Sequence, residues 1–254
     1  MNSFRHVVLI GPPGVGKGTF AGLLQAQTGW QHLSVGDCLR HEAKAGTALG
    51  RQVTDIMRAG SLVPDELAND VTFHHLDLLR KEQGQAEGWG RGVLLDGYPR
   101  TVQQAEALVT HAKRTDAAQS NSSGSSSSSF AAVQIVLDPE VAIEKLLSRR
   151  ACATCGRAFN TAHIVRGGYV MPAMLPDAQT CPRGPEACVP DLSVVRSDDT
   201  AVTIAHRMQE YEGKTAPVVQ FFERRGQLRR FEVFKGVQDT PALLRAICCQ
   251  LGID

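Results

Sequence analysis

A glycine-rich loop close to the start of the chain carries the clearest chemical signal in the sequence. It reads Gly11-Pro12-Pro13-Gly14-Val15-Gly16-Lys17-Gly18-Thr19. Glycine lets backbone N–H groups turn inward, and such groups, with the positive end of a helix dipole, bind phosphate oxygens. Lys17 adds a cation for the β and γ phosphates of a nucleotide. In the general phosphate loop a Ser or Thr follows the lysine and reaches Mg²⁺. Here Gly18 stands in that place and Thr19 comes one residue later, which indicates that the metal is held differently.

A carboxylate and a set of arginines form the second signal. Asp96 ends an apolar run and is followed by Gly97-Tyr98-Pro99-Arg100. A carboxylate in that place is suited to bind Mg²⁺ through water beside phosphates. Arginines stand at the ends or edges of predicted elements at Arg40, Arg100, Arg149, Arg150, Arg196 and Arg207. Phosphoryl transfer between two nucleotides needs such a group, because charge must be neutralised on donor, acceptor and the group in flight.

Apolar strands that alternate with helical patterns must position these residues. Val7–Ile10, Val93–Asp96 and Val133–Leu137 are typical of buried parallel strands. The alternation predicts an α/β fold, a P-loop NTPase-like, mostly parallel five-stranded sheet with helices on both faces. In such sheets the ligand lies at the carboxyl ends of the strands, which is where the glycine-rich loop and Asp96 fall.

Three segments interrupt the predicted core. Residues 37–81 have helical patterns and predict a lobe inserted between two strands. Residues 152–194 are rich in Gly and Pro and predict a second small lobe. Residues 119–130 include the serine-rich stretch Ser120–Ser129 and predict a flexible loop within the core. The core itself is expected to comprise residues 1–36, 82–151 and 195–254.

Composition limits the expected partners and location. The formal net charge of +1 gives no electrostatic reason to expect nucleic acid or a membrane as partner. No apolar run approaches the roughly 20 residues that span a bilayer. The first predicted strand begins a few residues after Met1, which leaves no room for a leader. This predicts a cytoplasmic protein, with an organelle as the alternative that stays open.

Four stretches in this order resemble the adenylate kinase family over nearly the whole chain. They are Gly11–Thr19, Ser34–Arg40, Val93–Arg100 with Gln104 beyond it, and Arg149-Arg150 with Arg196-Ser197-Asp198-Asp199 after an insert. In this family a glycine follows the loop lysine, so Gly18 matches the family's own pattern. The insert resembles the long lid of plant organelle-type members. The resemblance implies reversible, Mg²⁺-dependent transfer, ATP + AMP = 2 ADP, by a monomer that balances adenine nucleotides.

The resemblance also implies individual roles. The phosphates of ATP would be held by Gly14, Val15, Gly16, Lys17, Gly18 and Thr19, and its base would lie by Ala158 and Phe159. AMP would be contacted by Val35, Arg40, Ser61, Leu62, Val63, Gly97, Tyr98, Pro99, Arg100 and Gln104. Arg149, Arg196 and Arg207 would close over the transferring group, with Arg149 also on ATP and the other two on AMP. Magnesium-bound waters and the arginines would be oriented by Asp37, Asp96, Asp198 and Asp199. The implied catalytic set is Lys17, Asp96, Arg100, Arg149, Arg196 and Arg207.

Two departures from the family leave alternatives open. Val35 stands where adenine-specific members usually carry Thr, and it cannot hydrogen-bond a base, which favours considering a nucleoside monophosphate kinase with another acceptor. Lys145 stands where many members carry an Arg that stacks on the adenine of ATP, and Lys stacks less well. A non-catalytic nucleotide-binding module is a further hypothesis, against which the presence of both donor and acceptor cations weighs.

The predicted lid carries four cysteines that could hold zinc. Cys152 and Cys155 have the spacing of a zinc knuckle. A second pair, Cys181 and Cys188, is more widely spaced than usual. These four residues are a candidate structural zinc site, with His163 as a possible substitute ligand. A catalytic zinc is not expected, because the phosphoryl transfer implied by the resemblance uses Mg²⁺.

Overall fold

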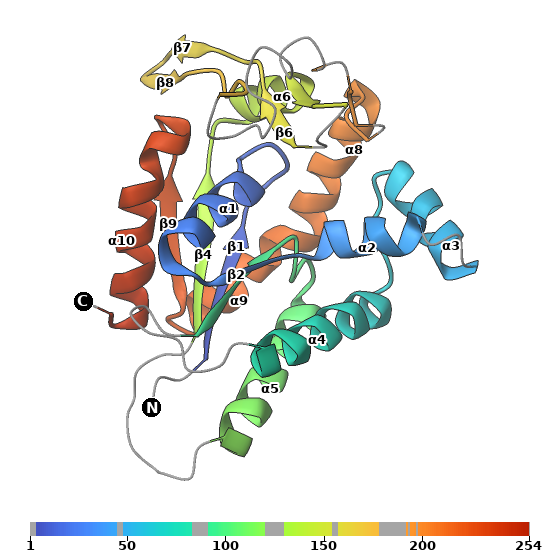
Figure 1. The fold of residues 1–254 in the computed structure, drawn as a ribbon, viewed down its shortest axis with the longest axis vertical. Helices are drawn as coiled ribbons and strands as arrows, with labels where there is room; N and C mark the ends of the chain where they lie inside the picture. Colours follow the sequence, from blue (N-terminus) through green and yellow to red (C-terminus); the bar gives the residue numbers. More distant parts are fainter. Residues whose placement is uncertain are drawn as a thin grey trace.

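A five-stranded sheet forms the centre of the molecule (Figure 1). The computed structural model describes residues 4–44, 48–82, 91–119, 130–153, 157–177, 192, 194–196 and 198–253. In spatial order the strands are β2 (Gln31–Ser34), β3 (Gly92–Asp96), β1 (Arg5–Ile10), β4 (Phe130–Val136) and β9 (Leu228–Glu232). Each neighbouring pair is parallel, so the carboxyl ends of all five strands meet at one edge. The predicted α/β fold is confirmed.

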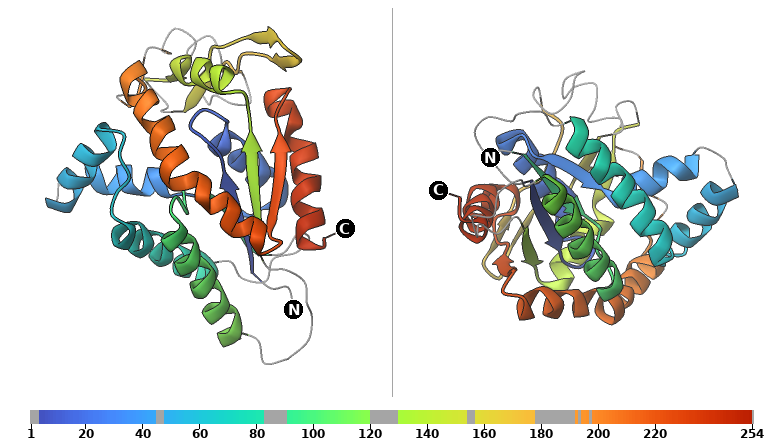
Figure 2. Two further views of the ribbon diagram at one scale, coloured as in Figure 1. Left: turned by 180° about the vertical axis from the view of Figure 1, so that it is seen from behind. Right: turned by 90° about the horizontal axis from the view of Figure 1, so that it is seen from below.

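Helices cover both faces of this sheet (Figure 2). Helices α1 (Lys17–Thr28) and α10 (Thr240–Leu251) pack on one face and contact each other. On the other face, α5 (Val102–Gln119) packs between α4 (Asp65–Glu82) and α9 (Ala216–Arg224). Among the described residues, no helix combines the length and apolar character that crossing a membrane requires.

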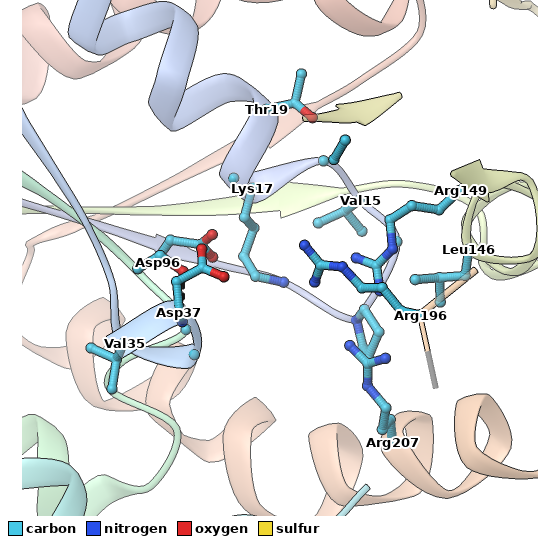
Figure 3. Close-up of a pocket in the computed structure, with 18 of the residues that line it drawn as sticks. Val15, Lys17, Thr19, Val35, Asp37, Asp96, Leu146, Arg149, Arg196 and Arg207 are labelled. Atoms are coloured by element: carbon cyan, nitrogen blue, oxygen red, sulfur yellow. Dashed lines mark hydrogen bonds between the residues drawn. The ribbon is translucent and has the colours of Figure 1, made fainter. Parts of the chain in front are cut away.

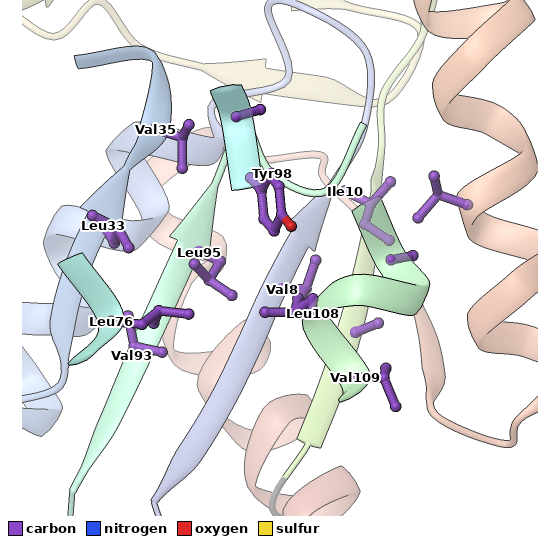
Figure 4. Close-up of a cluster of buried hydrophobic side chains, with 14 of the residues drawn as sticks. Val8, Ile10, Leu33, Val35, Leu76, Val93, Leu95, Tyr98, Leu108 and Val109 are labelled. Atoms are coloured by element: carbon purple, nitrogen blue, oxygen red, sulfur yellow. The ribbon is translucent and has the colours of Figure 1, made fainter. Parts of the chain in front are cut away.

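Alternate residues of each strand supply the two halves of the core. Val8 and Ile10 belong to the buried cluster under α4, α5 and α9, part of which is drawn in Figure 4. Val7, Leu9 and Leu94 belong to the cluster under α1 and α10. Because helices cover both faces, both sets of side chains are excluded from water, and the strands are apolar throughout rather than alternating.

Between β2 and β3 the described residues form three helices, in agreement with the helical patterns of residues 37–81 in the sequence. After α2 (Val35–Lys44) come α3 (Ala48–Arg58), which contacts α2, and then α4. Helices α2 and α3 extend to one side of the sheet (Figure 1), whereas α4 packs on α5. The acidic Asp65 and Glu66 lie in the first turn of α4, where they complement the helix dipole.

After β4 the described part of the chain forms α6 (Pro139–Leu147) and four short strands. Asp138 caps α6 by accepting hydrogen bonds from two backbone N–H groups of its first turn. The antiparallel pairs are β5 (Arg149–Ala151) with β6 (Ala158–Asn160), and β7 (Ile164–Arg166) with β8 (Tyr169–Met171). Tyr169 stacks on Phe234 with 5.5 Å between ring centroids, which joins the β7–β8 hairpin to the core. Residues 120–129 of the serine-rich segment lie outside the described residues.

One predicted helix differs from the structure in two ways. The sequence pattern from Asp198 to Phe222 predicts a single helix with Asp198 or Asp199 as its cap. Instead, Thr200 caps α8 (Ala201–Glu210) by accepting a hydrogen bond from the Thr203 backbone N–H, because the two aspartates are engaged with arginines. A π-helical turn, η1 (Tyr211–Thr215), then separates α8 from α9. It ends two residues before Pro217, which lacks the N–H that a continuous α-helix needs. A 3₁₀ turn, η2 (Gly236–Asp239), leads into α10.

Because the central strands are buried, we expect that shortening one of their core side chains greatly lowers the free energy of unfolding. Leu94 is fully buried between β3 and α1, whereas Leu78 on α4 is 40% exposed. We expect Leu94→Ala to lower the free energy of unfolding by about 2–5 kcal/mol, because it removes buried methyl groups and leaves a cavity. Leu78→Ala is the matched control and is expected to cost less than about 1 kcal/mol. Urea unfolding followed by circular dichroism measures both; equal losses would contradict this assignment of the core.

Candidate functional site

A cavity of about 580 Å³ lies at the carboxyl ends of the strands. Its walls come from the loop between β1 and α1, the end of β3, helix α2, the turn before α4 and the start of α5. Arg149, Arg196 and Asp198, which flank the predicted lid (residues 152–194) and are called the lid border below, complete the walls. In Figure 3, Lys17 lies between Asp96 and Asp37 on one side and Arg149, Arg196 and Arg207 on the other. The topology therefore gathers residues from distant parts of the sequence around one space.

The glycine-rich loop passes so close to α6 that a side chain cannot be accommodated at residue 14. A Cβ on Gly14 would lie 2.3 Å from the backbone oxygen of Ala142, and its φ of +88° is in the left-handed region. Gly16, with φ of +89°, is the N-cap of α1. The loop thus enters the helix through conformations that favour glycine, and the helix N-terminus faces the cavity as an anion site requires.

Lys17 folds back on the loop that precedes it. Its Nζ donates hydrogen bonds to the backbone oxygens of Gly11 (2.7 Å) and Pro12 (2.9 Å). Burial lowers the pKa of Lys17 to about 8; the charge of Asp96 opposes this shift, and nearby arginines reinforce it. Among the described residues, the direct hydrogen-bond partners of this ammonium group are carbonyl oxygens, and nearby arginines disfavour its charged form. A bound phosphate would stabilise the charged form.

The geometry around Asp96 gives a physical reason for glycine at residue 18. A Cβ on Gly18 would lie 2.9 Å from Oδ2 of Asp96, so a Ser or Thr at this position would compete with the carboxylate for the same space. Burial raises the pKa of Asp96, but His32 and Lys17 outweigh it and hold the pKa below its usual range. Nε2 of His32 lies 3.7 Å from Asp96 Oδ2. The carboxylate is thus kept ionised beside the loop.

Asp199 organises two of the arginines. Its side chain is fully buried and accepts two hydrogen bonds from Arg149, from Nε (2.7 Å) and Nη2 (2.6 Å). Nη1 of Arg207 donates to the same carboxylate (3.3 Å) and to Asp198 (3.0 Å). A buried bidentate pair fixes the guanidinium plane, so Arg149 and Arg207 are oriented before any ligand enters.

Three further arginines surround the cavity. Nε of Arg100 donates to the backbone oxygen of Gly97 (2.9 Å), and Arg40 pairs with Asp37 one turn earlier on α2. Burial and neighbouring arginines lower the pKa of Arg100 and of Arg196. These cations repel one another across the cavity, which favours binding of several negative charges.

The structure brings most of the predicted site residues to the cavity wall. They are Gly14, Val15, Gly16, Lys17, Gly18, Thr19, Val35, Arg40, Ser61, Leu62, Val63, Asp96, Gly97, Arg100, Gln104, Arg149, Ala158, Arg196 and Arg207. Asp37 and Asp198 also line it.

Three of the residues predicted to contact a nucleotide lie behind the wall. Tyr98 is buried beneath it and lines, with Pro99, a smaller adjoining cavity of about 60 Å³. Phe159 packs against Cys152 inside the lid, although its neighbour Ala158 reaches the cavity. The roles of these residues toward a ligand stay predictions.

Sequence reasoning missed part of the wall. Asn160 and Met174 enter from the lid, and Val233, Gly236 and Val237 enter from the segment after β9. Nothing in their residue types signals a site. The three residues after β9 reach it because β9 is the edge strand beside β4, which only the folded sheet order reveals. His32, the neighbour of Asp96, was also missed.

The zinc hypothesis falls mostly on residues outside the described part of the chain. Cys155, Cys181 and Cys188 lie there, and Cys152 is buried in the lid. Within the described residues no group of three or more His, Cys, Asp or Glu side chains is arranged to hold a metal ion.

Comparison with known proteins decides the family. The sequence model of the family described as "Adenylate kinase" matches residues 9–227. The chain belongs to the adenylate kinase family. It is 36% identical to an adenylate kinase of Moorella thermoacetica, over 98% of this chain and 99% of the relative. It is 33% identical to adenylate kinase 1, chloroplastic, of Arabidopsis thaliana, over 94% of this chain and 76% of the relative. It is 32% identical to a GTP:AMP phosphotransferase of Plasmodium falciparum, over 92% of both chains.

The lowered pKa of Lys17 makes nucleotide binding by this adenylate kinase pH-dependent. With a pKa of about 8, phosphate binding favours the protonated form, so ATP affinity should fall as pH rises through 8. At pH 8 binding should take up roughly half a proton at Lys17. Calorimetry in two buffers of different ionisation enthalpy measures this uptake.

Lys17→Arg is the control for that measurement. Arginine stays protonated throughout this range, so its uptake on binding ATP should be smaller than wild type by the contribution of Lys17. Equal uptake by the two proteins would show that Lys17 is already fully protonated without nucleotide, contrary to the expectation.

Proposed function

We propose that this adenylate kinase transfers the terminal phosphoryl group of MgATP to AMP, reversibly, giving two ADP. One observation carries the proposal. One cavity is lined by the phosphate loop with Lys17, by Arg40 and Arg100 from other elements, and by the further arginines Arg149, Arg196 and Arg207. A protein that only bound one nucleotide would not need cations for two.

The donor would occupy the end formed by the loop and the lid border. Backbone N–H groups of Gly14–Thr19 and the ammonium of Lys17 would hold the β and γ phosphates. The base would lie toward Ala158, Lys145 and Val237, which line the same end. Burial lowers the pKa of Lys145, and its aliphatic stem offers a surface for a flat base.

The acceptor would occupy the end formed by α2, the turn before α4 and the start of α5. Arg40 and Arg100 would hold the phosphate of AMP, because guanidinium groups match phosphate oxygens in pairs. Its base would enter between Val35, the segment Ser61–Val63, and Gln104.

Transfer itself would need positioning and charge stabilisation rather than a covalent intermediate. Arg149, Arg196 and Arg207 would face the phosphoryl group as charge spreads over its oxygens. Asp199 already orients Arg149 and Arg207, so little reorganisation would remain when the substrates meet. Closure of residues 37–81 and of the lid, 152–194, would exclude water that otherwise hydrolyses ATP.

The residues around Asp96 fit a magnesium ion bound with ATP. Oxygen ligands are those that Mg²⁺ prefers, and Asp96 is held ionised next to the loop. Its carboxylate would bind the ion through water, and the ion would neutralise charge on the phosphates. Glycine at residue 18 leaves room for this carboxylate.

A coupled assay that offers AMP, CMP, UMP, GMP and dAMP with MgATP tests the proposal. AMP should be converted to ADP. Val35 is 2% exposed and offers only methyl groups, so it cannot hydrogen-bond adenine and other acceptors must be tested. An enzyme that phosphorylates CMP or UMP but not AMP would replace this function. Retained ATP binding with no turnover of any acceptor would favour a binding module.

Arg100→Ala should weaken the use of AMP selectively. Removing a charge-assisted contact to the acceptor phosphate should raise KM for AMP about tenfold or more, while KM for ATP changes less than about threefold. Steady-state kinetics with each substrate varied measures the split. Arg229→Ala, at an exposed position of β9 outside the cavity, is the matched control. Equal effects on the two substrates would contradict the acceptor role.

A structural zinc ion in the lid is a second hypothesis, now supported only by the cysteine spacing. Metal analysis of protein purified without chelators tests it. One zinc per chain, with loss of thermal stability on removal, would support the site. A monomer in the cytoplasm also remains a prediction, which sedimentation and cell fractionation test.

A further inference from the structure

Gln104 lies in the wall of the acceptor end but is held on both sides by the protein. Its side chain is almost wholly buried. Its Oε1 accepts a hydrogen bond from the backbone N–H of Arg100 (2.7 Å), and its Nε2 donates to Oδ1 of Asp65 (2.7 Å). Asp65 lies in the first turn of α4, and Gln104 lies in the first turn of α5.

Each hydrogen-bond partner of this amide can serve in one role only, either as donor or as acceptor. A backbone N–H can only donate, and an ionised carboxylate can only accept. Rotating the amide by 180° would set Nε2 against the Arg100 N–H and Oε1 against Asp65, so both hydrogen bonds would be lost. The orientation of the Gln104 amide is therefore locked.

The carboxylate that locks the amide is itself held in place. Oδ2 of Asp65 accepts a hydrogen bond from Oγ1 of Thr101 (2.8 Å), and this hydroxyl accepts one from the backbone N–H of Gln104 (3.1 Å). One turn further along α4, Oδ1 of Asn69 accepts a hydrogen bond from the Tyr98 hydroxyl (2.5 Å). Helix α4 is thus joined at two successive turns to the loop that carries Arg100.

We propose that Asp65 is a positioning residue that sets which acceptor base is accepted, by locking the Gln104 amide; this rests on the proposed function. With one hydrogen bond already made at each end, Nε2 retains one N–H and Oε1 one lone pair. The base atom that faces Nε2 must accept, and the atom that faces Oε1 must donate.

This pattern selects bases that carry an amino group beside a ring nitrogen that accepts. Adenine and cytosine have that pair. Hypoxanthine and uracil carry a carbonyl beside a ring N–H, the reverse arrangement. An amide free to rotate would serve both kinds. Val35 also lines the cavity but has no polar side-chain atom, so it adds no hydrogen bond that distinguishes these bases.

The test compares AMP with inosine 5′-monophosphate, which differs from AMP only in this donor–acceptor pair. The wild-type enzyme should prefer AMP in kcat/KM. Asp65→Asn should reduce that preference about tenfold or more, because the new amide can donate or accept and Gln104 can rotate. KM for ATP should stay unchanged. Glu66→Gln removes the same charge from the neighbouring, exposed position of α4 and should leave the preference intact.

A double-mutant cycle with Gln104→Leu separates positioning from general damage. In that background, Asp65→Asn should no longer change the AMP/IMP ratio. Equal losses for both acceptors in Asp65→Asn, or an unchanged ratio, would overturn the proposal. If Asp65→Asn fails to fold, the wild-type enzyme provides the test. CMP should then bind more tightly than UMP. Equal turnover of IMP and AMP by the wild-type enzyme would overturn the proposal. A wild type that uses no AMP would instead contradict the proposed function.

Discussion

Repulsion among buried cations is the constraint on which the site depends. One cavity is lined by Lys17, Arg40, Arg100, Arg149, Arg196 and Arg207. Burial, and the charges of the other cations, lower the pKa of Lys17 and of several arginines. Five of the six have an oxygen partner among the described residues: backbone oxygens for Lys17 and Arg100, and carboxylates for Arg40, Arg149 and Arg207. The fold therefore holds a surplus of positive charge that bound phosphates would neutralise.

The parallel sheet makes this concentration of charge possible. Because the carboxyl ends of β1 and β3 lie side by side, the phosphate loop and Asp96 become neighbours although about eighty residues separate them. Close approach then restricts residue type. Gly14 leaves room for α6 and Gly18 leaves room for Asp96. The glycine that replaces Ser or Thr after the lysine is thus explained by packing against a carboxylate as well as by family likeness.

Local signals were sufficient to predict the fold class, the phosphate loop and most of the cavity wall. The apolar runs at β1, β3 and β4 and the spacing around Lys17 are contained within short windows of sequence. The link between Asp65 and Gln104 is not, because it joins the starts of two helices that only the packing of α4 on α5 brings together. The segment after β9 was missed for the same reason. The interruption of the long helix at η1 was foreseeable from Pro217, whose missing N–H is a local property.

Recognition of the acceptor base and binding of its phosphate depend on the same group of hydrogen bonds in this fold. The Gln104 amide that faces the acceptor base also fixes the backbone of Arg100, the residue proposed to hold the acceptor phosphate. Both depend on Asp65 at the start of α4, directly after the segment that lines the other side of the same space. A movement of α4 would therefore shift the amide and the Arg100 loop together. Such an arrangement couples the choice of base to the position of the phosphate that must meet the donor, so a wrongly bound base would also misplace the reacting oxygen.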